Sequence, residues 1–353
     1  MSQQSPVKVI QWATGRAGLP ALKAIIERPD TELVGLWVSS EAKDGKDAGE
    51  LCGLPANGVR ATRDTAALLA GPGDIVCYSA TDVGRVEEII DDLCAILESG
   101  KDLVTVAPTQ LFHISTADQT VVKRLRDACE RGRSSFHFTG IFPGLLNDSL
   151  IFSLSNLTHN IESITMAEML EISSYDPGML KALGFGEDPA KDSEDFPVEF
   201  LNYYWESILR YLAEAFGITF DETRHFREGA VAERAFVTTS GMEIPEGTLA
   251  ALHWGLEGVI DGKRRICVEH YERLHADIAP QWPQPPDRGG YRFTIKGEPD
   301  MTVDLAFGGS DPLTDAMVTT SNRAVNVLSA VHAAPPGIIE TFSDLPFTPG
   351  LMR

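Results

Sequence analysis

The sequence lacks the features of a membrane or secreted protein. No run of about 18 apolar residues, the length that spans a bilayer, occurs in the chain. Its first residues, M-S-Q-Q-S-P, contain neither the basic segment nor the apolar segment of a secretory signal. We therefore expect a soluble cytoplasmic protein without a membrane partner.

Basic residues are scarce, which argues against a nucleic-acid partner. The 353 residues include 30 lysines and arginines against 51 acidic residues, a formal net charge of −21. Proteins that bind nucleic acids need a basic face to neutralise phosphates. We expect no nucleic-acid partner.

Metal-binding and hydrolase motifs are also missing. The five cysteines are scattered and form no C-x-x-C pair, so neither a zinc knuckle nor a disulfide framework is predicted. No cluster of histidines and carboxylates has metal-ligand spacing, and no G-x-S-x-G motif stands out. The sequence therefore predicts no bound metal and no serine hydrolase.

The first 145 residues alternate between strand-like and helix-like segments. Short apolar runs typical of buried strands occupy residues 7–12, 33–38, 59–62, 74–79, 103–107 and 134–138. Helical patterns lie between them, at residues 19–27, 65–69, 83–97 and 119–131. This alternation predicts an α/β fold, a Rossmann-type doubly wound parallel sheet that forms a dinucleotide-binding domain over residues 1–145.

The pattern changes in the second part of the chain. Strand-like stretches occur at residues 161–172, 235–239, 248–260, 264–275, 291–296 and 301–307, and an aromatic-rich helix is expected at 200–216. Asp261 and Gly262 form a hairpin signal between two of the strands. We predict an α+β domain on a mostly antiparallel sheet over residues 146–314. Residues 315–353 form a C-terminal helix and tail that return to the first domain.

The turn after the first strand indicates a nucleotide-binding site. The segment W-A-T-G-R-A-G places Thr14, Gly15, Arg16, Ala17 and Gly18 directly before a helix. Glycines there let backbone N–H groups approach a pyrophosphate at the helix N-terminus. Alanine at position 13 replaces the first glycine of G-x-G-x-x-G, which is acceptable if its φ stays negative. A plain strand–helix turn is the alternative.

The end of the second strand bears on the choice of cofactor. Sites that prefer NAD carry an acidic residue there, which binds the ribose 2′-hydroxyl. Here Ser39 and Ser40 occupy the position, and Lys43 and Arg16 are within reach of a 2′-phosphate. We expect NADP(H) to be preferred and NAD(H) to be possible, since Glu41 argues for the latter.

Ligands of doubly wound sheets bind beyond the carboxyl ends of the strands. Small residues near these ends are candidate cofactor contacts: Ser79, Ala80, Thr81 and Ala107. Candidate residues of the substrate pocket are His113, Phe138, Thr139 and Tyr175. His113 is a candidate proton donor or a loop residue without a role, and His137 reads as a core histidine.

The motifs together resemble a known family. W-A-T-G-R-A-G, G-L-W-V-S-S, D-A-G-E-L-C-G-L-P and C-Y-S-A-T-D in the first domain are similar to dihydrodipicolinate-reductase-like oxidoreductases. With T-G-I-F-P-G, S-Y-D-P-G-M-L-K-A-L-G-F-G and V-E-H-Y-E-R-L-H-A-D-I-A-P-Q-W-P, the chain resembles the branch of 2,4-diaminopentanoate dehydrogenase and the native amine dehydrogenases. The resemblance implies hydride transfer with NAD(P)H, reductive amination of a ketone, and a homodimer formed through the second domain.

Two departures from this family matter. The histidine pair and lysine of true dihydrodipicolinate reductases are absent, which argues against lysine biosynthesis. Amine dehydrogenases are expected to place a glutamate just beyond the fifth strand, but no acidic residue lies between Asp102 and Asp118. Thr109 and Gln110 stand there as candidate catalytic residues that bind a carbonyl but are not bases. A carboxylate of the second domain, Glu168 or Glu171, is an alternative.

We therefore expect an NAD(P)-dependent oxidoreductase that acts on a carbonyl, imine or amine carbon of a small, apolar ketone or amine. A ketone or imine reductase without amination activity is one alternative, and a non-catalytic NAD(P)-binding sensor is another. A sugar or inositol dehydrogenase ranks below these, because the E-K-P motif of that family is replaced by A-P-T at residues 107–109.

Overall fold

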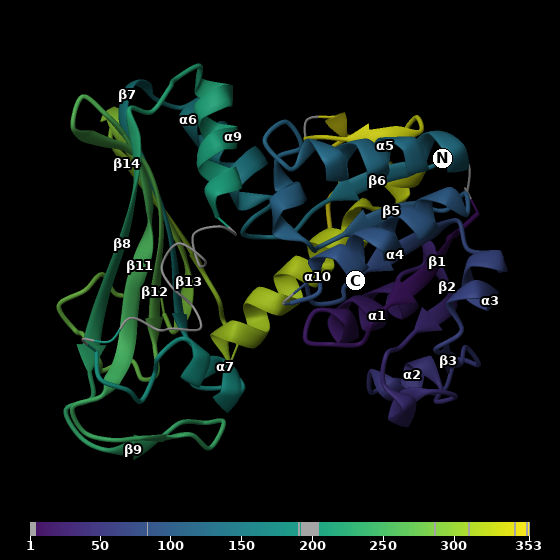
Figure 1. Ribbon diagram of the computed structural model, residues 1–353, viewed down its shortest axis with the longest axis horizontal. Coiled ribbons are helices and arrows are strands. Elements are labelled where there is room, and N and C mark those ends of the chain that lie inside the picture. The colour runs from purple at the N-terminus through teal and green to yellow at the C-terminus, as the bar shows by residue number, and fades with distance from the viewer. Residues whose placement is uncertain are drawn as a thin grey trace. The chain divides into compact units, whose positions relative to one another are not determined.

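A parallel sheet is built from both ends of the chain (Figure 1). The computed structural model describes residues 5–82, 84–189, 191, 205–285, 287–309, 311–341, 344–350 and 352, and within them this sheet has seven strands in the order β15-β6-β5-β4-β1-β2-β3. The strands are β1 (Val7–Trp12), β2 (Thr31–Trp37), β3 (Ala61–Thr62), β4 (Ile75–Tyr78), β5 (Asp102–Thr105), β6 (Ser135–Phe138) and β15 (Gly337–Ile339). All their pairings are parallel, which confirms the predicted Rossmann-type sheet.

Four of the helices between these strands lie within a few residues of the predicted ranges. They are α1 (Gly18–Glu27), α2 (Ala48–Leu51), α3 (Thr65–Ala70), α4 (Val86–Glu98) and α5 (Gln119–Gly132), with short 3-10 turns at Glu41–Lys43 and Thr109–Phe112. The Asp64 side chain caps α3 by accepting the Ala67 N–H, and Gly100 follows α4 with a φ of +84°. The four-residue helix α2 was not predicted; it begins at Asp47, whose carboxylate accepts the N–H of Gly49.

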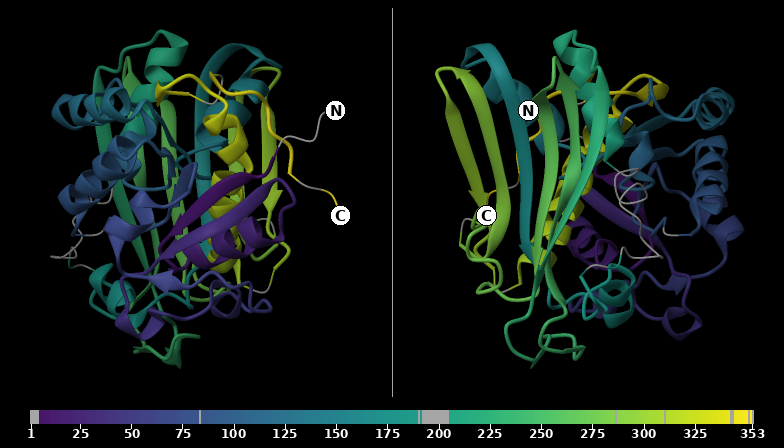
Figure 2. Two further views of the ribbon diagram at one scale, coloured as in Figure 1. Left: turned by 90° about the vertical axis from the view of Figure 1, so that its right-hand side faces the viewer. Right: turned by 60° about the vertical axis from the view of Figure 1, so that its left-hand side comes forward.

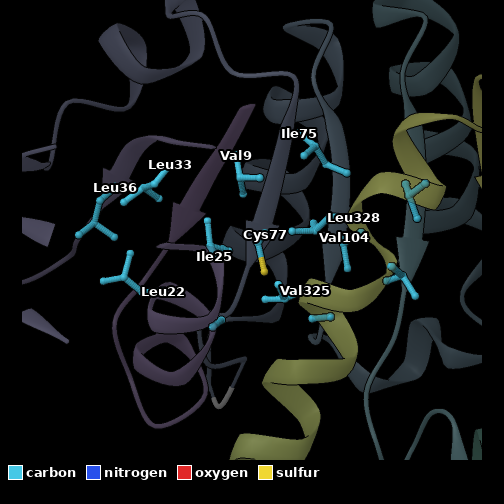
Figure 3. Close-up of a cluster of buried hydrophobic side chains, with 14 of the residues drawn as sticks. Val9, Leu22, Ile25, Leu33, Leu36, Ile75, Cys77, Val104, Val325 and Leu328 are labelled. Carbon is cyan, nitrogen blue, oxygen red and sulfur yellow. The ribbon is translucent and has the colours of Figure 1, made fainter. Parts of the chain in front are cut away.

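The C-terminal segment completes the first sheet and its core. The chain divides into two compact units, Met1–Ser149 with Met317–Arg353, and Leu150–Ala316. Helix α10 (Pro312–His332) supplies Val325 and Leu328 to a core that includes Val9 and Val104, as Figure 3 shows. Strand β15 then pairs with β6, and it was not predicted because three residues carry no periodic pattern.

A second sheet forms the other unit, and Figure 2 shows its strands side by side. Within the described residues its order is β14-β13-β7-β12-β11-β8. These strands are β7 (His159–Glu171), β8 (Glu222–Val231), β11 (Leu249–Ile260), β12 (Lys263–Arg273), β13 (Gly289–Glu298) and β14 (Met301–Ala306). The pairing of β7 with β12 is parallel and the others are antiparallel, so the predicted mostly antiparallel sheet is confirmed. Asp261 and Gly262, with φ of 52° and 72°, form the predicted hairpin turn.

Short elements surround this second sheet. They are the π-turn at Leu146–Leu150, α6 (Ile151–Ser155), α7 (Pro177–Ala182), α9 (Glu206–Phe216), β9 (Phe236–Val237) and β10 (Glu243–Ile244). The predicted aromatic helix at 200–216 corresponds to α9 from residue 206 onward, and its residues Phe200, Tyr203 and Tyr204 lie outside the described residues. Tyr211 packs edge-on against Phe152, with ring centroids 5.5 Å apart, so this aromatic side chain belongs to the packing of the unit. None of the helices in the described residues combines the length and apolarity of a membrane span.

Candidate functional site

The turn after β1 has a backbone that the sequence did not predict. Ala13 adopts a φ of +75°, so the expectation of a negative φ at this position is wrong. Two hydrogen bonds hold the residue in place: its N–H donates to Trp37 O at 3.0 Å, and its carbonyl accepts Gln11 Nε2 at 3.0 Å. A non-glycine residue in this region costs about 1–2 kcal/mol. The turn therefore keeps the geometry of the glycine pattern at an energetic cost.

The two glycines of the turn face different surroundings. A Cβ added at Gly18 would lie 2.3 Å from the Ala13 carbonyl oxygen, so helix α1 can begin this close to the turn only with glycine at this position. A Cβ at Gly15 would meet no protein atom within 4 Å. The Ser321 hydroxyl of α10 donates to Ala17 O at 2.6 Å, so the C-terminal segment stabilises the turn. The open side at Gly15 leaves room for a phosphate to approach the backbone of the turn.

Lys43 joins the end of β2 to this turn. Its Nζ donates to Thr14 Oγ1 at 2.9 Å and to the Thr14 carbonyl at 3.1 Å. Ser39 and Ser40, which follow β2, are exposed. Arg16, in the turn after β1, is exposed as well. The structure thus brings Lys43 and Thr14 into contact and leaves both serines accessible at the strand end.

The ends of β4 and β5 hold a group of polar side chains with unused hydrogen-bonding capacity. Ser79 is buried and accepts Gln11 Nε2 at 3.4 Å. Among the described residues, no partner reaches the buried atoms Asp82 Oδ2, Thr109 Oγ1 or the amide oxygen and nitrogen of Gln110. The backbone N–H of Thr109 lies close enough to the Asp82 carboxylate to act on its pKa. Burial raises the pKa of Asp82, and backbone N–H groups of Asp82 and Thr109 oppose this.

Asp82 was not singled out from the sequence. The segment S-A-T-D was considered for its small residues, and carboxylates were considered in the stretch that follows β5 and at Glu168 and Glu171. The available signal was topological: β4 and β5 are neighbours, with Tyr78 opposite Thr105, so the segments after them leave the same edge of the sheet.

Residues after β5 and β6 form the apolar part of this edge. Ala107, Phe138 and Thr139 are buried, and Phe138 packs edge-on against Phe112 with centroids 6.3 Å apart. Thr139 donates its N–H to Thr105 O at 2.8 Å, while its hydroxyl is another buried atom without a partner in the described chain. Of the other predicted contacts, Ala80 is half-buried and Thr81 is exposed.

The candidate histidines are held inside the protein. His113 is buried, and its two ring nitrogens lie 2.9 Å from the hydroxyls of Thr116 and Ser115 in its own loop. His137 lies in β6 with Nδ1 at 3.1 Å from Ile339 O, and burial lowers its pKa from 6.5 to about 4. His137 is therefore a neutral core residue, as predicted.

Tyr175 and the alternative carboxylates belong to the second unit. Tyr175 is half-buried just after β7. Glu168 accepts Tyr291 Oη–H at 2.7 Å and lies 3.2 Å from His270 Nδ1. Glu171 accepts the Ser173 hydroxyl at 3.3 Å. No group of histidines, cysteines and carboxylates in the described part of the chain has the arrangement of a metal site.

Comparison with known proteins places these features in a family. The profile of the 2,4-diaminopentanoate dehydrogenase C-terminal domain matches residues 145–353. A curated amine dehydrogenase from Streptomyces virginiae is 30% identical over 354 residues, which cover 98% of this chain and 98% of that protein.

Solved structures share the fold. The structure of an amine dehydrogenase from Mycobacterium smegmatis superposes with a TM-score of 0.78 at 19% identity, covering 99% of this chain and 98% of the other. Biliverdin reductase from Synechocystis sp. PCC 6803, solved with biliverdin and NADP+, has a TM-score of 0.50 at 15% identity and covers 92% and 91% of the two chains. At these identities the likeness concerns the fold alone.

Proposed function

Because the chain belongs to the family of 2,4-diaminopentanoate and amine dehydrogenases, and is an NAD(P)-dependent oxidoreductase, we propose that it interconverts a small ketone and the corresponding amine. The similarity over 98% of the chain to an amine dehydrogenase carries this proposal. When bound, the cofactor supplies or accepts a hydride at the nicotinamide ring.

The turn after β1 fits the pyrophosphate of such a cofactor. The backbone from Thr14 to Gly18 precedes α1, whose N-terminus has no side-chain cap. The N–H groups of Leu19 and Ala21 donate to the carbonyls of Gly15 and Ala17, so the N–H groups of the turn itself would approach the phosphates. A phosphate-binding turn needs free space on its outer side, as at Gly15, and close packing of the helix against the turn, as at Gly18. Ser39, Ser40, Lys43 and Arg16 would hold the 2′-phosphate of NADP(H), the preferred cofactor, with NAD(H) as the alternative.

The carboxyl ends of β4 to β6 would receive the nicotinamide and the substrate. Ser79, Ala80, Thr81 and Ala107 leave room for the nicotinamide ribose, and Thr109, Gln110 and Thr139 offer hydroxyl and amide groups to a polar substrate atom. The buried Phe138 and Phe112 beside them favour an apolar substrate. His113 is proposed as a wall residue of the substrate pocket, and Tyr175 stays a prediction from the sequence.

A second candidate function is reduction of a ketone without ammonia. One observation favours it: the stretch after β5 carries Thr109 and Gln110 in place of the glutamate expected in amine dehydrogenases. Thr109 and Gln110 can hydrogen-bond a carbonyl oxygen but cannot accept a proton from ammonium near neutral pH.

A panel of apolar ketones separates the two functions. Each ketone is mixed with NADPH or NADH, with and without ammonium chloride, and the loss of reduced nicotinamide is followed by absorbance. We expect ketone-dependent oxidation that requires ammonium, and amine-dependent reduction of NADP+ in reverse. Equal rates with and without ammonium would favour the ketone reductase.

A further inference from the structure

A carboxylate of the segment after β4 lies near the stretch that follows β5. Strands β4 and β5 run side by side in parallel, with Cys77 opposite Val104 and Tyr78 opposite Thr105. The segments that follow them, which contain Asp82 and Thr109, therefore emerge at one edge of the sheet. The Thr109 backbone N–H lies near enough to the Asp82 carboxylate to lower the pKa of that carboxylate, so the two segments approach each other.

Polar side chains of these two segments have buried atoms that make no hydrogen bond within the described chain. Asp82 Oδ2, Thr109 Oγ1 and both polar atoms of the Gln110 amide are shielded from solvent, and none has a hydrogen-bond partner in the described chain. Buried polar atoms in native proteins nearly always have partners. A carboxylate oxygen accepts hydrogen bonds and favours a positive charge, so the group suits a small cation that donates N–H.

The other ionisable side chains near these strands already make hydrogen bonds within the protein. Asp92 accepts the Tyr78 hydroxyl at 2.9 Å, and Asp102 accepts the Ser135 N–H at 2.6 Å and contacts His332. Both ring nitrogens of His113 contact hydroxyls of its own loop. Asp82 is thus the carboxylate that the described residues place at the end of β4 with an unused oxygen.

We propose that the Asp82 carboxylate is the catalytic acid–base group of this site, in place of the glutamate expected after β5, and that it binds the ammonium and iminium forms of nitrogen. The inference rests on the proposed amine dehydrogenase function. Thr109 and Gln110 then position the carbonyl and amino groups through their hydroxyl and amide atoms.

In the proposed reaction, one proton moves between ammonium, the Asp82 carboxylate and the departing water. The carboxylate takes a proton from ammonium, and the resulting ammonia adds to the carbonyl carbon to give a carbinolamine. The carboxylic acid returns the proton to the hydroxyl group, which leaves as water, and the carbon–nitrogen double bond of the iminium forms. The carboxylate then faces the iminium cation, whose carbon accepts the hydride from NAD(P)H to give the amine and NAD(P)+. Burial favours this role, because it raises the pKa of Asp82 toward the range where proton exchange is efficient.

The test compares Asp82→Asn and Asp82→Ala with wild type in reductive amination. We expect Asp82→Asn to lower kcat by about 100-fold or more, which is the usual contribution of a general acid–base group. The affinity for NADPH, followed by nicotinamide fluorescence, should change less than threefold. Formate, a small carboxylate, should restore part of the activity of Asp82→Ala but none of that of Asp82→Asn. The matched control is Asp92→Asn, a carboxylate on α4 whose pKa burial also raises, and its kcat should stay within threefold of wild type.

The outcomes separate this inference from the proposed function. If wild type aminates ketones and Asp82→Asn retains its kcat within threefold, the assignment of Asp82 is overturned while the function stands. If wild type aminates no ketone of the panel, the proposed amine dehydrogenase function is wrong. Binding of cyclohexylammonium to the NADP+ complex then tests whether Asp82 binds an ammonium group. Calorimetry should then show at least tenfold weaker binding for Asp82→Asn than for wild type. Equal binding, or no binding to either protein, overturns the assignment.

Discussion

Glu272 makes the stability of the second unit depend on pH. Its carboxylate lies on β12, largely enclosed, and accepts the indole N–H of Trp254 at 3.1 Å. Burial raises the pKa of Glu272 from 4.5 to about 7; the charge of Glu168 also raises it, whereas the bond from Trp254 lowers it. The Glu272→Gln variant keeps the size and the acceptor of the side chain and removes the charge.

The size of the effect follows from this shift. Between pH 4.5 and about 7 the folded chain holds a proton that the unfolded chain releases, so the free energy of unfolding falls as the pH rises. A shift of about 2.5 units (7 − 4.5), at 1.36 kcal/mol per unit, corresponds to roughly 3 kcal/mol. Relative to wild type, Glu272→Gln should therefore gain about 2–3 kcal/mol of stability between pH 5 and pH 8.

Urea unfolding at several pH values measures this difference. The fluorescence of Trp205, Trp254 and Trp282 reports on the second unit, which contains all three. Glu246→Gln, at an exposed turn of the same unit, is the control and should follow wild type at every pH. A constant difference between Glu272→Gln and wild type from pH 5 to pH 8 would refute the reasoning.

Four further substitutions test the turn after β1 and Lys43, which contacts it. Gly15→Ala should leave the free energy of unfolding within about 0.5 kcal/mol of wild type but weaken NADPH binding at least tenfold. Gly18→Ala should lower both the free energy of unfolding and the NADPH affinity, because its Cβ would lie 2.3 Å from Ala13 O. Equal NADPH affinities for Gly15→Ala and wild type would contradict the proposed binding of the pyrophosphate at this turn. Ala13→Gly should raise the free energy of unfolding by roughly 0.5–1 kcal/mol in urea titrations, since glycine tolerates the φ of +75°; a loss of stability would argue against that conformation. Lys43→Met should weaken NADPH binding about tenfold more than NADH binding in fluorescence titrations, and equal losses would show that Lys43 acts only by holding Thr14.

The periodicity of the sequence predicted most of the fold because buried parallel strands are continuous apolar runs. β4 is such a run and β1 is largely apolar, and both were found. β8 was missed because its ten residues are mostly charged or polar and half-buried or exposed, so it shows neither an apolar run nor a clean alternation. β15 was missed because a strand of three residues is fixed by its partner β6 and not by its own pattern.

The candidate site could be predicted from the sequence only in part, and its residues stay predictions. The glycines, Lys43 and the residues after β5 are adjacent to recognisable strand ends, so position along the chain located them. The φ of Ala13 depends on hydrogen bonds to Trp37 and Gln11, which no local pattern reveals. The proximity of Asp82 to Thr109 requires the order of the strands, which follows from the sheet and not from either segment.

The dependence of ketone reduction on ammonium tests the central claim most directly. Wild-type protein is mixed with NADPH and an apolar ketone, and the initial rate is measured as ammonium is raised from zero. The account predicts a rate that rises from near zero and saturates, with the amine as product. A rate that is already maximal without ammonium, with the alcohol as product, would contradict it.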